Sequence, residues 1–104
     1  MEIIWTKTGK NSLKATLKFI NLNFSVAIAQ SIRNEIETQV NQLSLHPYMG
    51  KKDSIHSTTT KTFRYLIIKR RSKLYYYIQN NVIYIILVWD VRQDIKSLHQ
   101  SLDV

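Results

Sequence analysis

The residues of this chain that could take part in chemistry are mostly lysines and arginines. Of its 15 basic residues, more than half fall between positions 51 and 73, where Asp53 is the only acidic residue. They are Lys51, Lys52, Lys61, Arg64, Lys69, Arg70, Arg71 and Lys73. A cluster of this kind attracts polyanions or an acidic protein partner. The alternative is the solvated face of a basic protein, whose net charge here is +8.

Three cations are candidates for a catalytic role because they adjoin predicted strands or lie within them. Arg92 follows a long apolar run, so a sheet would fix its backbone, and Arg64 and Lys73 lie in the two strands before that run. Cations held in this way can bind a phosphate and stabilise the charge that develops on it. For Arg92 the alternative is a salt bridge to Asp90 or Asp94. For the other two it is an ordinary solvated strand position.

Other chemistries find little support in the sequence. The chain has no cysteine, which excludes disulfides, thiolate metal sites and thiol nucleophiles. His46, His56 and His99 are far apart and lack the spacing of metal ligands, so we expect no metal. No glycine-rich phosphate loop is present, and we expect no cofactor.

The spacing of apolar residues predicts two helices after a short N-terminal strand at residues 2–6. The first helix begins near Thr8, carries an apolar stripe, and ends in a break at residues 21–25. Ser25 can cap the second helix, which ends before Pro47. The stripes are Leu13, Leu17 and Ile20 on the first helix, and Ala29, Ile32, Ile36, Val40 and Leu43 on the second. Helices joined so closely form an antiparallel hairpin whose stripes we expect to face the core.

The second half of the chain predicts a loop and three strands. The loop covers residues 46–61, and the strands cover 62–69, 73–79 and 82–89, with residues 70–72 as the first connection. Asn80–Asn81 fits a tight hairpin turn, because asparagine tolerates a positive φ. The last strand is apolar almost throughout, which indicates a central position in the sheet.

Three consecutive tyrosines lie in the middle strand. Tyr75 and Tyr77 would point to one face of the sheet and Tyr76 to the other. Aromatic rings beside basic residues can stack nucleic-acid bases. More often they fill the interface between a sheet and a helix, and we favour that place for them.

These elements predict one α+β domain over residues 1–104. It consists of an N-terminal strand, an antiparallel helical hairpin and a three-stranded antiparallel meander. The first strand would add to the edge of the meander, and the helices would cover one face of the sheet. No segment approaches the roughly 18 apolar residues that suggest a membrane span, and the N-terminus lacks a signal peptide's apolar core. We therefore expect a soluble cytoplasmic protein with no membrane partner.

The order and spacing of these elements resemble the RelE/ParE family of toxins from type II toxin–antitoxin modules, over nearly the whole chain. The most specific part is residues 63–98, with an arginine-led strand, a "YY-I" strand, a two-residue turn and an apolar strand ending in "WDVRQD". That ending is similar to the "WDNRQN" of one ParE-like branch. "LSLHPYMGKK", residues 43–52, resembles the leucine–proline–glycine passage that follows the family's second helix.

The resemblance implies a cytoplasmic toxin that a small acidic antitoxin neutralises, a pairing that the charge of +8 also favours. ParE-like members inhibit DNA gyrase by binding, and this is the activity that we favour. Lys61, Lys69, Arg70 and Arg71 are the expected contacts to an antitoxin or to nucleic acid. A third possibility is an attenuated member that only binds its antitoxin.

The alternative activity is that of RelE-like members, which cut messenger RNA on the ribosome. On that pattern Arg64, Lys73 and Arg92 match the basic residues that stabilise the cleaved phosphate, and His99 could act as an acid or base. Two positions depart from the pattern, since Leu66 replaces a lysine and Leu98 replaces a tyrosine. These departures weaken the ribonuclease hypothesis.

Overall fold

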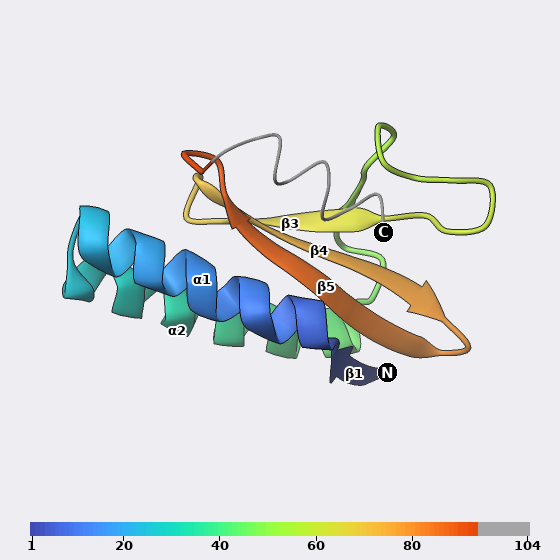
Figure 1. Ribbon diagram of the computed structural model, residues 1–104. Coiled ribbons are helices and arrows are strands. Elements are labelled where there is room, and N and C mark those ends of the chain that lie inside the picture. Colours follow the sequence, from blue (N-terminus) through green and yellow to red (C-terminus); the bar gives the residue numbers. More distant parts are fainter. Residues whose placement is uncertain (94–104) are drawn as a thin grey trace.

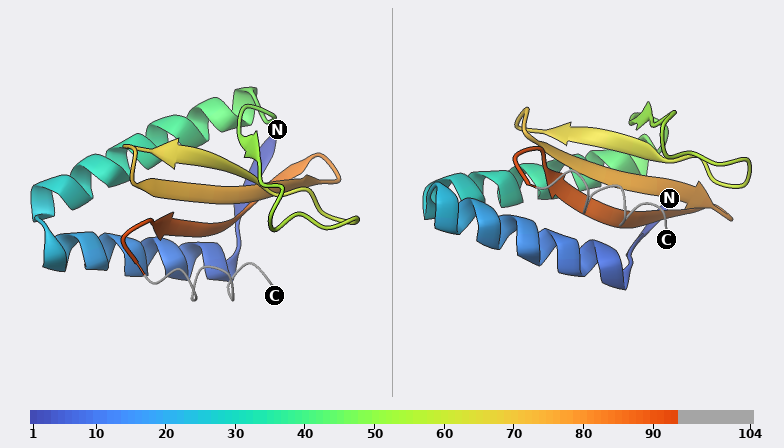
Figure 2. Two further views of the ribbon diagram at one scale, coloured as in Figure 1. Left: turned by 90° about the horizontal axis from the view of Figure 1, so that it is seen from above. Right: turned by 45° about the horizontal axis from the view of Figure 1, so that its top comes forward.

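Two helices lie side by side against one face of a five-stranded sheet (Figure 1). The structure is a computed structural model, and it describes residues 1–93. The elements are β1 (Glu2–Trp5), α1 (Lys7–Asn23), α2 (Val26–Leu45), β2 (Lys51–Lys52), β3 (Arg64–Ile68), β4 (Ser72–Gln79) and β5 (Val82–Asp90). The predicted α+β fold, with a helical hairpin on one face of the sheet, is confirmed (Figure 2).

The strands of the sheet are arranged in the order β1-β5-β4-β3-β2. β3, β4 and β5 form the predicted antiparallel meander, and β1 adds to its edge by pairing in parallel with β5. β5 is therefore an interior strand, as its apolar composition predicts. One extra residue of β5, Ile86, forms a bulge opposite the step from Tyr75 to Tyr76.

Beyond the end of β1, hydroxyl side chains at the start of α1 and within it form hydrogen bonds with the backbone of β5. Thr6 caps α1 by accepting a hydrogen bond from the amide of Gly9 (3.0 Å), and its hydroxyl donates to the carbonyl of Ile85 (3.1 Å). Ser12 accepts from the amide of Val88 (2.9 Å), and Thr16, one turn further along the helix, donates to the carbonyl of Val88 (3.0 Å). These side chains satisfy backbone groups that a longer β1 would otherwise pair.

Gly9 is required by this close approach of helix and strand. A Cβ atom at this position would clash with the carbonyl oxygen of Ile85. A side chain would therefore push the start of α1 away from the sheet.

The predicted apolar stripes of both helices form the core against the sheet. Ile20 of α1, together with Ile32, Ile36 and Leu43 of α2, is buried, and the other stripe residues pack around them. Tyr76 of β4 is wholly buried in the same cluster, whereas Tyr75 belongs to a second cluster, with Leu87, on the other face. The predicted placement of Tyr75 and Tyr76 on alternate faces is confirmed, but the predicted interface with the helices holds Tyr76 and not Tyr75.

The connections differ from the predictions in three places. α1 continues to Asn23 instead of breaking at residue 21, because the side-chain amide of Asn23 donates to the carbonyl of Phe19 (2.8 Å) and satisfies the last turn. The predicted loop at 46–61 contains β2, whose two residues pair with β3. The first meander turn consists of residues 69–71, and Ser72 belongs to β4.

Candidate functional site

Arg92 lies at the end of β5 and forms an ion pair with Asp90. Its Nε donates to Oδ1 and its Nη2 to Oδ2, both at 2.8 Å, and its backbone amide also donates to Oδ1 (2.9 Å). The Asp90 side chain is wholly buried. Of the two alternatives, the salt bridge to Asp90 is therefore the one observed, and Asp94 lies outside the described residues.

This ion pair determines the charge state of Asp90. Burial by itself raises the pKa of the carboxyl group. The hydrogen bonds from the side chain and backbone of Arg92, its positive charge and a hydrogen bond from Ser72 outweigh that effect and hold the pKa below its ordinary value. Asp90 is accordingly ionised at neutral pH, and the charge of Arg92 is compensated inside the fold.

Arg92 also fastens β5 to the turn between the helices. Its guanidinium lies 3.8 Å from the centre of the Phe24 ring, at the junction of α1 and α2. The side-chain oxygen of Gln93 accepts from the amide of Asp90 (2.8 Å) and lies 3.2 Å from the hydroxyl oxygen of Thr16. We define Asp90, Arg92 and Gln93 as the C-terminal clamp.

Arg64, at the start of β3, holds the loop that follows α2. Its Nη1 donates to the carbonyls of Gly50 (2.9 Å) and Tyr48 (3.3 Å), and its guanidinium lies 5.2 Å from the centre of the Tyr48 ring. The hydroxyl of Tyr76 donates to the carbonyl of Pro47 (2.8 Å) and accepts from the amide of Gly50 (2.9 Å). This loop is therefore fixed at two points.

A concave site, which we call the basic cleft, lies beside Arg64 and the end of β4. Its volume is about 330 Å³. Tyr48, Lys52, Thr60, Lys61, Thr62, Arg64, Tyr77, Ile78 and Gln79 line it. The lining holds three cations and no acidic side chain. The ammonium group of Lys61 lies 4.6 Å from the centre of the Tyr77 ring.

Lys73 lies on the face of the sheet opposite to Arg64. Arg64 pairs with Tyr76 and Ile67 pairs with Lys73, and successive residues of a strand point to opposite faces. The ammonium group of Lys73 lies 4.7 Å from the centre of the Tyr65 ring. The structure therefore does not bring Arg64, Lys73 and Arg92 together, and His99 lies outside the described residues.

Lys69, Arg70 and Arg71 form the exposed turn between β3 and β4. Lys69 has a φ of 50° and Arg70 a φ of 71°, in the left-handed region that side chains other than glycine, asparagine and aspartate rarely adopt. Of the four predicted binding cations, three therefore share this turn, while Lys61 lines the basic cleft.

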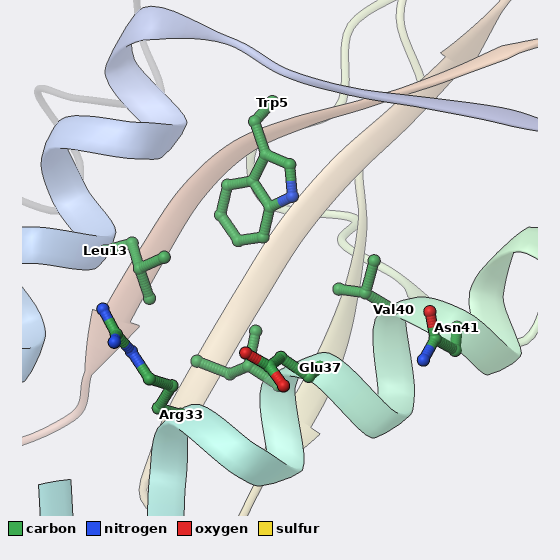
Figure 3. Close-up of a pocket in the computed structure, with 7 residues that line it drawn as sticks. Trp5, Leu13, Arg33, Glu37, Val40 and Asn41 are labelled. Carbon is green, nitrogen blue, oxygen red and sulfur yellow. The ribbon is translucent and has the colours of Figure 1, made fainter. Parts of the chain in front are cut away.

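A larger groove opens between the two helices beside β1 (Figure 3). Its volume is about 580 Å³. Trp5, Leu13, Ile36 and Val40 give it apolar walls, and Arg33, Glu37 and Asn41 of α2 add polar groups. The sequence predicts Leu13, Ile36 and Val40 as core, and their periodicity contains no sign that they also line a groove.

An aspartate–histidine pair is the feature that sequence reasoning missed. The ring Nδ1 of His56 lies 2.6 Å from Oδ2 of Asp53, whose other oxygen accepts from the amide of Ile55 (3.0 Å). The ring of Tyr75 meets His56 edge to face, 6.5 Å between centres. Burial, followed by the negative charge of Asp53, raises the pKa of Tyr75 to about 12. In the sequence, the spacing of three residues between Asp53 and His56 was the feature that could have predicted the pair. The pair organises the loop before β3.

Residues 1–93 contain no group of three or more histidine, aspartate or glutamate side chains that could hold a metal ion. Within the same part of the chain, no helix combines the length and apolar character needed to cross a membrane.

The fold and these surfaces define a class of protein: a small basic α+β domain with a helical hairpin on one face of its sheet and cations placed at separate points. A family model described as the ParE toxin of the type II toxin–antitoxin system, parDE, matches residues 3–95. The chain belongs to the ParE toxin family, which confirms the predicted resemblance.

A solved structure supports the fold independently. A chain of the chromosomal ParDE TA system from P. aeruginosa is similar to this chain, with a TM-score of 0.68 and 18% sequence identity. The similarity covers 88% of this chain and 97% of that one. A comparison with curated proteins finds no match.

Proposed function

We propose that this chain is a toxin that inhibits growth by binding DNA gyrase, and that an acidic antitoxin neutralises it. The observation that carries this proposal is the separation of the three cations that a ribonuclease of the RelE type would use together. Membership of the ParE family supports the same reading.

Cleavage of RNA needs several charged groups within hydrogen-bonding reach of one phosphate. Arg64 and Lys73 lie on opposite faces of the sheet. The Nε and Nη2 groups of Arg92 each donate a hydrogen bond to the buried carboxylate of Asp90. A surface of this kind suits binding to a macromolecule better than stabilising a single reacting phosphate.

The antitoxin would supply acidic residues to the exposed turn cations Lys69, Arg70 and Arg71. Two of these residues adopt a strained φ, which costs about 1 kcal/mol or more for each residue. A turn built only for stability would use asparagine or glycine there. The cationic side chains at this position are therefore better explained by a partner than by the turn itself.

A supercoiling assay with purified gyrase tests the proposed target. Relaxed plasmid, gyrase and ATP are incubated with increasing amounts of the toxin, and supercoiled product is measured on a gel. We expect supercoiling to fall as toxin is added, with relaxation by a type I topoisomerase unchanged as the control. Undiminished supercoiling in the presence of excess toxin would exclude gyrase, and normal growth on induction without antitoxin would indicate an attenuated member.

A further inference from the structure

We propose that the basic cleft binds a single-stranded nucleic acid, with its cations on the phosphates and Tyr48 as a stacking surface for a base. The inference goes beyond the proposed gyrase target. It concerns a ligand of different chemistry and a site that the clamp at Arg92 does not touch.

The cations of the cleft lack a compensating charge among the described residues. Lys52, Lys61 and Arg64 line the cleft, and none of its lining residues is acidic. Arg64 donates to two neutral carbonyls, which orient the guanidinium without removing its charge. Asp53, the nearest acidic residue along the chain, is buried and paired with His56. Three cations gathered in a concave site raise the local concentration of anions.

The cleft exists because β4 is longer than its neighbour. β3 begins at Arg64, which pairs with Tyr76, so that the last three residues of β4 have no strand beside them on this side. Ile78 and Gln79, at this end of β4, line the cleft together with Thr60 and Thr62. The threonine hydroxyl groups can donate to phosphate oxygens.

The wall that carries Tyr48 is rigid before any ligand binds. The Tyr76 hydroxyl bridges Pro47 and Gly50. A Cβ atom on Gly50 would lie 2.6 Å from that hydroxyl, so only glycine fits here. Because the site is already formed, binding need not order this part of the loop.

The exposed ring of Tyr48 favours a nucleic acid over a simple anion. It is 65% exposed although the guanidinium of Arg64 lies over it. An anion such as a carboxylate needs only the cations, whereas a strand with unpaired bases also uses an aromatic platform, at about 1–3 kcal/mol for each stacked base. A duplex, whose bases are already stacked, would not use Tyr48.

Fluorescence anisotropy tests the inference. The probe is a labelled oligothymidine of about 12 nucleotides, titrated with the protein at about 50 to 200 mM salt. The cleft variant is Lys52→Ala/Lys61→Ala, and the matched control is Lys10→Ala/Lys14→Ala. Both variants remove two charges from exposed positions. The third variant is Tyr48→Ala, and thermal melting confirms that each variant is folded.

We expect the cleft variant to bind the strand at least about tenfold more weakly. The negative slope of log K against log salt should become less steep by about 1.4, because each lost contact to a single strand removes about 0.7. The control should keep the wild-type slope. Tyr48→Ala should weaken binding to the strand by about tenfold and leave binding to a duplex unchanged.

Two results would overturn the inference. Equal weakening by the cleft and control variants would mean that binding follows net charge alone. Displacement of the probe by oligoglutamate at the concentration at which unlabelled oligothymidine displaces it would make the cleft a site for an acidic peptide. The assay contains no gyrase, so its failure leaves the proposed target untouched, and failure of the supercoiling assay leaves the cleft untouched.

Discussion

The arginines at the two ends of the sheet have different partners. At one end of the sheet, where β5 finishes, Arg92 is paired with Asp90, a carboxylate that is wholly buried. At the other end, where β3 begins, Arg64 donates to the neutral carbonyls of Tyr48 and Gly50 and lies over the Tyr48 ring. Ser72 and Tyr76, the β4 partners of Asp90 and Arg64, lie four positions apart, or roughly 13 Å along the strand.

The difference distinguishes a cation that is paired with a carboxylate of its own fold from one that donates to neutral carbonyls. Arg92 has its counter-ion within the fold, and removing either partner leaves the other in a costly state. Among the lining residues that the structure describes, Arg64 shares the basic cleft with two lysines and no acid, and we propose that its counter-ion comes from a ligand. A basic residue beside a strand can therefore be neutralised within the fold or remain available to a ligand, and its hydrogen-bond partners distinguish the two cases.

The largest expected effect is that of Arg92→Ala on stability. The substitution leaves the Asp90 carboxylate buried without its partner, and we expect a loss of about 3 kcal/mol in the free energy of unfolding. Urea denaturation measures it, with Lys14→Ala as the control for an exposed cation. A loss no larger than that of the control would mean that the clamp contributes little.

The same substitution is a poor test of catalysis. Arg92→Ala would reduce toxicity by unfolding the protein even if Arg92 touches no substrate. The double variant Asp90→Asn/Arg92→Gln removes both charges together and should be more stable than Arg92→Ala. The toxicity of the double variant therefore tests a catalytic role of Arg92 better than the toxicity of Arg92→Ala does.

A smaller effect is expected from acid. Because the folded pKa of Asp90 lies below its ordinary value, its ion pair stabilises the protein at neutral pH, and this contribution is lost as the pH falls below about 4 toward the folded pKa. The loss should be smaller than in Arg92→Ala, since a protonated carboxyl group is neutral. Thermal melting between neutral pH and strong acid should show a flatter profile for Asp90→Asn than for the wild type. The same pH dependence of melting in Asp90→Asn and in the wild type would contradict the assignment of this acid sensitivity to Asp90.

The smallest effect concerns the two tight turns of the meander. Asn80 and Asn81 adopt φ values of 53° and 62°, which asparagine tolerates well. Lys69 and Arg70 adopt similar φ values, which lysine and arginine tolerate poorly. Arg70→Gly should therefore stabilise the protein by about 1 kcal/mol. Arg71→Gly, at a residue whose φ is not positive, should destabilise it by about 0.5–1 kcal/mol. Destabilisation by both would show that the turn is unstrained.

Much of the fold could be predicted from local patterns. The apolar stripes predict which helix faces are buried, Ser25 caps α2 through the amide of Ile28, and Asn80–Asn81 forms the predicted turn. Each of these features depends on residues that are close in the sequence, so their spacing is sufficient.

The features that could not be predicted depend on partners far along the chain. β2 has only two residues and exists because β3 lies beside it. The bonds from Ser12 and Thr16 to β5 span more than 70 residues. Which face Arg64 and Lys73 occupy depends on the register of the strands. Spacing alone therefore could not separate Arg92, which is paired with Asp90, from the cations that we propose to bind a ligand.

The most direct test of the account is primer extension on a defined message in a reconstituted translation system, with and without the purified toxin. We expect the message to remain intact, because Arg64, Lys73 and Arg92 do not meet at one phosphate. Cuts that appear only while ribosomes translate would contradict the account and would establish a ribosome-dependent endoribonuclease.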